Sequence, residues 1–213
     1  SPFWGVMSKY ISAKKLLLIG SVGYGVGQFL FGFFSSPWII IMGRLISGAF
    51  VSAVFVAASY YVISISNDED KSKNIAKMVT VFSVSGMAGY FIGGYLGTIS
   101  LALPFVVQVS VLVLSGILFY VCLLDSEVES VVDLNRIWSG SNPLVKRKTP
   151  LSNDYKILFV VILLTSIAST TLSQTYSYYL VDVLNMTSLA NGVTKGLVGV
   201  GSMILNFTLT LWI

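Results

Sequence analysis

Long apolar runs, nearly free of charge, are the feature that most restricts the folds open to this chain. Each run is close to the length of about 20 residues at which an α-helix crosses about 30 Å of hydrocarbon. Six such runs are found, at Leu16 to Phe34, Trp38 to Ile63, Met78 to Gly97, Pro104 to Leu124, Ile157 to Val181 and Gly192 to Ile213. The sequence therefore predicts an all-α fold, a polytopic transmembrane helical bundle.

The composition agrees with a chain that lives in a membrane. Hydrophobic residues make up 55% of the 213 residues, charged residues make up 10%, and histidine is absent. A soluble domain of this length needs a more charged surface. The sequence contains no pattern typical of a metal site, a nucleophile with its base, or a phosphate-binding loop, so we expect neither an enzyme nor a bound cofactor or metal.

Lysine and arginine lie in alternate loops, and this predicts the orientation in the membrane. The loops at 35–37, 98–103 and 182–191 contain no basic residue. The other loops hold Lys9, Lys14 and Lys15, then Lys71, Lys73 and Lys77, then Arg136, Lys146, Arg147, Lys148 and Lys156. Because cationic loops resist translocation, we expect this second set to be cytoplasmic. Topology thus accounts for the net charge of +4, and nucleic acid is not an expected partner.

One polar segment, from Asp125 to Asp154, is longer than any other connection. It is acidic first, then rich in Ser, Asn, Pro and Gly, and then basic at Lys146-Arg147-Lys148. This composition is typical of a linker between two bundles. We predict an N-terminal bundle over 1–124, a cytoplasmic linker over 125–154 and the start of a second bundle over 155–213. Because the chain starts without methionine and its last apolar run reaches its end, we expect the bundle to be incomplete.

Five glycines lie within one stretch of twelve residues, at Gly86, Gly89, Gly93, Gly94 and Gly97. Gly89, Gly93 and Gly97 are four apart and predict a smooth helical stripe on which another backbone packs closely. The stretch from Gly89 to Gly94 resembles the fifth-helix motif Gly-Pro-x-x-Gly-Gly of major facilitator superfamily antiporters. Tyr90 stands where that motif has proline, so the kink that proline causes is not expected.

The stretch from Gly5 to Lys14 resembles the motif that the same superfamily carries between its helices 2 and 3. Gly5 and Lys14 fit the motif, whereas Lys9 replaces its aspartate. That aspartate is held to latch the two bundles together, so the resemblance implies that Lys9 removes or inverts the latch. The alternative is that Lys9, Lys14 and Lys15 only anchor the chain at the membrane surface.

Arg44 begins a stretch that resembles the fourth-helix pattern Arg-x-x-x-Gly of the superfamily. At about 1.5 Å per residue from Ile39, Arg44 lies about 8 Å inside its span. An arginine at such a depth costs about 2.5 to 3.5 kcal/mol on insertion scales, so it should face a polar cavity or a partner. The alternative is that its side chain extends back to the outer interface. The resemblance implies that Arg44 belongs to a proton-coupling network.

Acidic residues are absent from the middle of every predicted span. All nine lie in loops or at helix ends: Asp68, Glu69, Asp70, Asp125, Glu127, Glu129, Asp133, Asp154 and Asp182. The chain therefore has no mid-membrane carboxylate to pair with Arg44 or to carry a proton. If the complete protein is proton-coupled, we expect the titrating carboxylate to lie outside this chain.

The run from Ile157 to Val181 has the richest polar face. Ser166, Thr170, Gln174 and Tyr178 are four apart and share one side of a helix. By the resemblance, this run corresponds to helix 7 of the superfamily, in which helices 1, 4, 7 and 10 line a central cavity. We therefore expect Thr170, Gln174 and Tyr178 to contact substrate. Facing them we expect Arg44, Ser47, Met87 and Tyr90. The alternative is that these polar groups only bond between helices.

Lys195, near the outer start of the last run, leaves two interpretations open. Its ammonium either binds an anionic group of a substrate or reaches out to the lipid headgroups.

The resemblance favours the drug:proton antiporter branch. It implies alternating-access efflux of small amphipathic or drug-like compounds, with the proton gradient as energy source. The expected partners are a small-molecule substrate, protons and the lipid bilayer of the plasma membrane, and the full-length protein is expected to be a monomer. Two alternatives remain: a solute:proton symporter or uniporter for sugars or metabolites, and a non-transporting receptor or assembly partner with the same fold.

Overall fold

The computed structural model describes residues 2–125 and 153–212, and within them every long element is a helix. The side chains of residues 2, 153–156, 174, 206, 207 and 209–212 lie outside this description. The elements are α1 (Pro2–Met7), α2 (Ala13–Phe33), α3 (Pro37–Ile65), α4 (Lys71–Ile99), α5 (Leu103–Cys122), α7 (Asn153–Tyr178), the π-helix η1 (Tyr179–Val183) and α8 (Ser188–Trp212).

The prediction of an all-α transmembrane bundle is confirmed. Of the described residues, 5 helices are long and apolar enough to cross a membrane: α2, α3, α4, α5 and the stretch 157–183. The sixth predicted run forms α8, a helix of 25 residues. The predicted boundary between bundles falls in residues 126–152, which lie outside the described part, so the division into two bundles and a linker stays a prediction.

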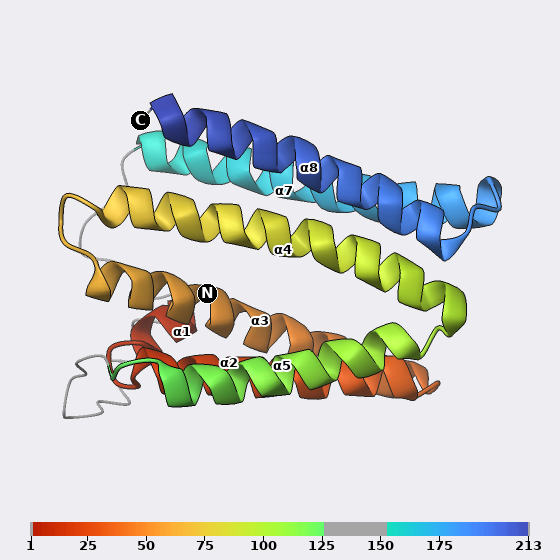
Figure 1. Cartoon of the computed structure of the whole chain (residues 1–213), viewed down its shortest axis with the longest axis horizontal. Coiled ribbons are helices and arrows are strands. Elements are labelled where there is room, and N and C mark those ends of the chain that lie inside the picture. Colours follow the sequence, from red (N-terminus) through yellow and green to blue (C-terminus); the bar gives the residue numbers. More distant parts are fainter. Residues whose placement is uncertain (1, 126–152, 213) are drawn as a thin grey trace.

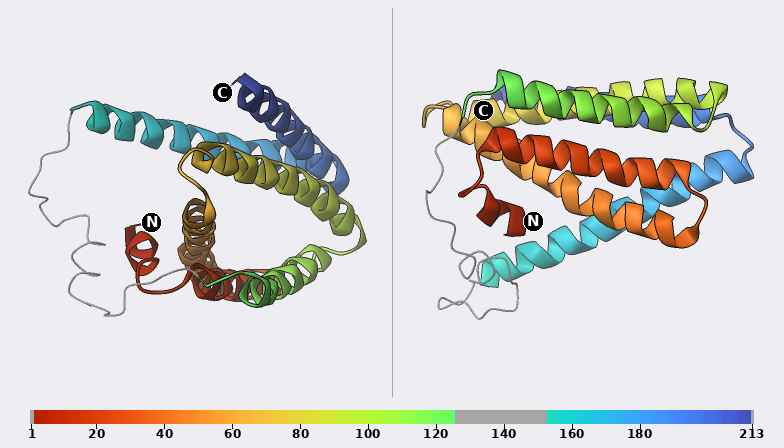
Figure 2. Two further views of the ribbon diagram at one scale, coloured as in Figure 1. Left: turned by 60° about the vertical axis from the view of Figure 1, so that its left-hand side comes forward. Right: turned by 90° about the horizontal axis from the view of Figure 1, so that it is seen from below.

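The helices form two groups joined by α4 (Figures 1 and 2). α2 packs against both α3 and α5, and the short α1 packs on α3. α4 contacts α3 and α5 on one side and packs along α8 on the other. α4 thus connects α1, α2, α3 and α5 to α8, and η1 links α8 to α7.

Burial is concentrated where α2 meets α3. Leu16, Leu17 and Ala57 form a buried cluster, to which Trp4 of α1 is added at the edge. The indole Nε1 of Trp4 donates a hydrogen bond to the carbonyl oxygen of Ala49 at 2.7 Å. Many other large apolar side chains on the helices are exposed. Such exposure suits a helix surface that faces lipid, because the hydrocarbon of lipid is as apolar as these side chains.

α4 begins at Lys71, seven residues before the predicted start at Met78. Its 29 residues span about 43 Å, more than the hydrocarbon thickness, so the lysine-bearing first turns continue the helix beyond the apolar run. The hydropathy of the sequence marks only the part of a helix that lies in lipid. The helix itself ends where its backbone hydrogen bonds end.

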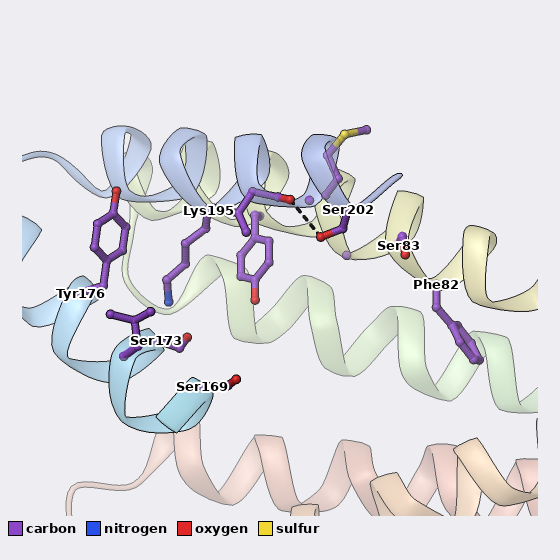
Figure 3. Close-up of a pocket in the computed structure, with 13 residues that line it drawn as sticks. Phe82, Ser83, Ser169, Ser173, Tyr176, Lys195 and Ser202 are labelled. Carbon is purple, nitrogen blue, oxygen red and sulfur yellow. Dashed lines mark hydrogen bonds between the residues drawn. The ribbon is translucent and has the colours of Figure 1, made fainter. Parts of the chain in front are cut away.

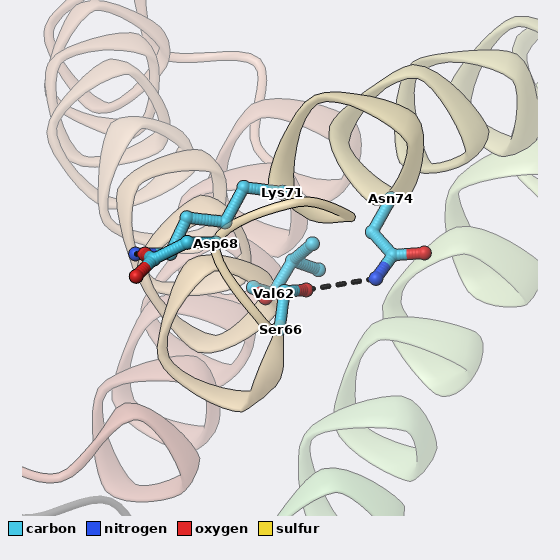
Figure 4. A network of polar contacts seen from close by, with 5 residues as sticks. All are labelled: Val62, Ser66, Asp68, Lys71 and Asn74. Atoms are coloured by element: carbon cyan, nitrogen blue, oxygen red, sulfur yellow. Dashed lines mark hydrogen bonds and ion pairs between the residues drawn. The ribbon is translucent and has the colours of Figure 1, made fainter.

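Polar contacts fix the loop between α3 and α4 (Figure 4). Ser66 Oγ donates to the carbonyl oxygen of Val62 at 2.6 Å and accepts from Asn74 Nδ2 at 2.9 Å. Lys71 Nζ lies 2.6 Å from Asp68 Oδ1. This hydrogen bond and the lysine charge lower the pKa of the Asp68 carboxyl. The loop therefore holds α3 and α4 as antiparallel neighbours.

A second ion pair joins the start of α2 to the end of α5. Lys14 Nζ lies 2.6 Å from Asp125 Oδ2. The hydrogen bond from Lys14, together with the lysine charge, holds the pKa of the Asp125 carboxyl below its ordinary value of 3.8. Lys14, which the sequence placed in the loop motif, thus connects two neighbouring helices on the side of the bundle where the basic loops lie.

Replacing Lys14 by methionine is expected to lower the melting temperature slightly at neutral pH, because Asp125 is exposed and such pairs contribute little. A carboxyl with a lowered native pKa contributes stability above its unfolded pKa and loses it as the pH falls through the native pKa. The difference between wild type and Lys14→Met should therefore shrink as the pH falls below 3.8, the ordinary value, and vanish below the lowered native pKa. Melting curves in detergent from pH 7 to pH 3 test this, with the exposed Lys73→Met as the control. A difference that does not shrink toward the acidic end would contradict the ion-pair explanation.

Candidate functional site

A pocket of about 700 Å³ lies between α4, α7 and α8. Clefts of this size hold drug-sized ligands. The residues that line it are Phe82, Ser83, Gly86, Met87 and Tyr90 of α4, Ser169, Leu172, Ser173 and Tyr176 of α7, and Lys195, Val198, Gly199 and Ser202 of α8. Its walls are mostly apolar, with hydroxyl groups and one ammonium group among them. Figure 3 shows the side chains that converge on it.

Close packing of α4 on α8 forms one side of this pocket. A Cβ added to Gly94 would lie 2.9 Å from Gly192 Cα and 3.0 Å from the carbonyl oxygen of Ser188. A Cβ on Gly192 would lie 2.5 Å from the carbonyl oxygen of Tyr90. Only glycine permits such an approach of two backbones. Further along, Gly199 of α8 meets the side chain of Met87.

The glycine-rich motif of α4 therefore packs differently from the prediction. Gly97 lies against Ser188 as a packing glycine, but Gly86, Gly89 and Gly93 have no other described atom within 4 Å of the position of a Cβ. Within the described residues only Gly97 of the predicted stripe makes such a contact, and close packing at Gly89 and Gly93 stays a prediction. The face of α4 that contacts α8 is rotated by about one residue from the predicted stripe, because α8 crosses α4 at Gly94.

The matching stripe on α8 was missed from the sequence, although its signal is present. Gly192, Gly196 and Gly199 are spaced by four and three residues and so share one helix face. In the structure they meet Gly94, the ring of Phe91 and Met87 respectively. Small residues on both helices, three or four apart, are the feature that identifies a close crossing.

Of the predicted cavity residues, the structure brings Met87 and Tyr90 into the pocket. Thr170 and Tyr178 of α7 are exposed and do not line it. The face of α7 that lines the pocket is rotated by about one residue from the predicted face. It carries Ser169, Leu172, Ser173 and Tyr176. The side chain of Gln174 lies outside the described residues, so its predicted contact with substrate stays a prediction.

Ser47 lies elsewhere, buried between α2 and α3. Its Oγ accepts a hydrogen bond from Nε2 of the equally buried Gln28 at 3.3 Å. Ser47 therefore bonds between helices, which was the alternative to a cavity role. Gln28 was missed from the sequence, although an amide inside an apolar run is itself a signal of a polar contact with another helix.

Arg44 finds an aromatic partner. Its guanidinium lies over the ring of Phe31 of α2, 3.7 Å from the ring centroid. Phe31 in turn makes an edge contact with Phe105 of α5. Within the described residues Arg44 makes no ion pair, and its side chain is exposed. A cation over a ring face is stabilised by about 0.5 to 2 kcal/mol, which offsets part of the cost of its depth.

Lys195 points from α8 into the pocket (Figure 3). Its Nζ lies 5.8 Å from the centroid of the Tyr90 ring. Tyr90, the residue in the proline position of the antiporter motif, thus lines the pocket and faces this cation. The structure places Lys195 with the pocket residues rather than with the exposed residues of the outer loop.

The loop-motif residues do not gather at this pocket. Gly5 has no other described atom within 4 Å of its Cβ position, and Lys9 is exposed. Lys14 pairs with Asp125 at the end of α5. Within the described residues no group of three His, Cys, Asp or Glu side chains is arranged to hold a metal ion.

The bundle and its pocket define a polytopic helical membrane protein with a small-molecule-sized cavity between helices. A family model for the Major Facilitator Superfamily matches residues 1–213, so the chain belongs to this superfamily of membrane transporters. The resemblance found in the fifth-helix, fourth-helix and loop motifs is thereby confirmed at the level of the superfamily.

Curated relatives match at low identity. The quinolone resistance protein NorA of Staphylococcus aureus (strain MSSA476) is 23% identical over 188 residues, which cover 87% of this chain and 46% of that protein. The class C tetracycline resistance protein of Escherichia coli is 30% identical over 105 residues, covering 49% of this chain and 26% of that protein. The chain thus spans about half the length of NorA. No solved structure matches it significantly.

Proposed function

We propose that the complete protein exports small amphipathic compounds by alternating access and uses the proton gradient as its energy source. The observation that carries this proposal is the pocket between α4, α7 and α8, whose apolar walls and scattered hydroxyls suit an amphipathic molecule. The names of the relatives, resistance proteins for quinolones and tetracycline, support export of drug-like compounds.

The contact between α4 and α8 suits a pivot between two moving bodies. Its glycines keep the two backbones close and leave few interlocking side chains between them. One helix can therefore rotate against the other at a low cost in free energy. The pocket lies beside this contact, with α4 on one wall and α7 and α8 on the others. Rocking about the contact would open the pocket to one side of the membrane and then to the other.

Proton coupling needs a group that titrates, and the described helices supply no carboxylate within the membrane. Asp68, Glu69, Asp70, Asp125 and Asp182 all lie at helix ends or in loops. We assign Arg44 to the coupling network because it is a charge on the membrane-spanning helix α3 without an ion pair to any described residue. Its carboxylate partner would come from residues beyond this chain.

Location and partners complete the proposal. The described lysines of the loops before α2 and between α3 and α4 lie at the same end of the bundle, which supports a cytoplasmic position for that end (Figure 1). Residues 125–154 would then be a cytoplasmic linker of a plasma-membrane protein. We propose a monomer, with protons and a small molecule as ligands.

Replacing Arg44 by alanine is expected to lower gradient-driven efflux about tenfold or more, because a charge that biases the proton-carrying state is lost. The measurement uses inverted vesicles that contain the complete protein, with an imposed proton gradient and three fluorescent amphipathic probes, one cationic, one neutral and one anionic. Arg44→Lys is the conservative variant, and Lys73→Ala on the exposed first turn of α4 is the control.

The wild type decides the function. Export of any of the three probes that stops when the gradient is collapsed supports a proton-driven exporter. Export that continues after collapse excludes proton coupling. If no probe moves although the protein is correctly inserted, the proposal fails in favour of a narrow solute transporter or a non-transporting relative.

A further inference from the structure

The pocket between α4, α7 and α8 has one charged group among its lining residues, and that group is a cation. Lys195 lies in the second turn of α8, and its side chain is partly buried. The other lining residues are apolar or carry hydroxyls, and no Asp or Glu is among them. A ligand placed here therefore meets a positive charge at a defined point on an apolar wall.

The ammonium group of Lys195 retains most of its capacity to donate hydrogen bonds. An ammonium group has three donors and no acceptor. Its one recorded contact within the described residues is with the ring face of Tyr90, which leaves those donors without an oxygen acceptor. A lysine at this depth is unfavourable in hydrocarbon, so its place is explained by an aqueous pocket or by an anion that enters it.

The neighbours of Lys195 suit the same kind of ligand. The hydroxyl-bearing side chains of Ser173 and Tyr176 line the pocket from α7, across from the ammonium (Figure 3). Hydroxyl groups donate hydrogen bonds to the oxygens of an anion, and such charge-assisted bonds are stronger than neutral ones. Met87, Leu172 and Val198 offer apolar surface for the rest of the molecule.

We propose that this pocket binds amphipathic organic anions, carboxylates in particular, with the negative group at Lys195 and the apolar body against Met87, Leu172 and Val198. The proposal rests on the proposed function and names the substrate class of the same site. It opposes a preference for organic cations, because the lining residues present Lys195 and no counter-charge to a cation.

The test is equilibrium dialysis with the complete protein in phosphatidylcholine nanodiscs, and empty nanodiscs correct for partition into lipid. Three probes share one naphthalene body: naphthylacetate is an anion, naphthylacetamide is neutral, and naphthylethylamine is a cation. At pH 7 and low salt we expect the acetate to bind about tenfold more tightly than the amide, and the amine to bind most weakly.

Variants locate the preference at one side chain. Lys195→Met should remove the difference between acetate and amide, whereas Lys195→Arg should keep most of it. Lys73→Met, an exposed lysine outside the pocket, should keep all of it. If Lys195→Met does not fold, the equally uncharged Lys195→Gln takes its place.

Equal binding of acetate and amide by the wild type, no binding of any probe, or a preference that survives in Lys195→Met would each overturn the proposal. Because no gradient is applied, these outcomes are independent of efflux. A protein that prefers the acetate but exports nothing would overturn the proposed function, whereas gradient-driven export without the preference would overturn only the anion site.

Discussion

Leucine in place of Gly94 is expected to abolish transport and to destabilise the contact between α4 and α8, whereas the same change at the neighbouring Gly93 should have little effect. A Cβ at position 94 would lie 2.9 Å from Gly192 Cα and 3.0 Å from the carbonyl oxygen of Ser188. Both are backbone atoms, which move only if the whole helix moves. The helices must therefore separate, and the pocket beside them loses its shape.

Substitutions at Gly94 and Gly93 should change the free energy of unfolding in opposite directions and by different amounts. Alanine at position 94 should cost about 1 to 3 kcal/mol, the usual penalty of overpacking, and leucine more. At position 93 no other described atom lies within 4 Å of a Cβ, so alanine there should gain about 0.5 to 1 kcal/mol through helix propensity. Thermal unfolding in detergent and efflux from vesicles would be measured for both pairs of variants.

Gly192→Ala provides an independent check from the other helix. Its Cβ would lie 2.5 Å from the carbonyl oxygen of Tyr90 and 2.8 Å from Gly94 Cα. It should reproduce the defect of Gly94→Ala, and the double variant should be worse than either. If Gly94→Leu unfolds at the same temperature as Gly93→Leu and exports normally, α4 and α8 do not make this close contact.

The helices of this chain were predictable because the membrane sets their length. Uncharged runs of about 20 residues have few structures open to them in hydrocarbon. The predicted runs agree with α2, α3, α5, α7 and α8 to within a few residues, and the largest difference is the start of α4. That difference arises at Lys71 to Lys77, where the helix leaves the lipid and hydropathy carries no further information.

The faces of the helices were harder to predict. In water an apolar stripe marks the packed side, but lipid and a neighbouring helix are equally apolar, so hydropathy does not distinguish them. Two differences between the predicted and the observed helix faces have this origin. Gly89 was placed in the stripe where Gly94 lies, and Thr170 was placed in the cavity where Ser169 and Ser173 lie.

Pairing between helices also requires information that one helix lacks. Gln28 and Ser47 are single polar residues in separate apolar runs, and their hydrogen bond appears only when α2 and α3 are placed side by side. Arg44 was expected to face a polar cavity or a partner, and in the structure its partner is the ring of Phe31. Neither partner follows from spacing along the chain.

The crossing of α2 and α3 predicts the largest loss of stability in the chain, at Gly27. A Cβ there would overlap Ser47 Oγ, and it would lie 2.6 Å from the backbone nitrogen of Ser47 and 2.8 Å from the carbonyl oxygen of Gly43. Alanine should cost about 1 to 3 kcal/mol by overpacking. It also displaces Ser47 and leaves the buried amide of Gln28 without its partner, which adds about 1 to 3 kcal/mol.

A small set of variants separates these two contributions. Ser47→Ala alone removes the hydrogen bond without adding a clash, so it should show the second cost only. Combined with Gly27→Ala, it relieves the overlap with Oγ but leaves the backbone contacts, so the pair should be less destabilising than the sum of the two single changes. Gly48→Ala, next to Ser47 on α3 and with no other described atom within 4 Å of its Cβ, is the control. Additive losses in thermal unfolding, or a Gly27→Ala as stable as Gly48→Ala, would mean that α2 and α3 do not meet at Gly27.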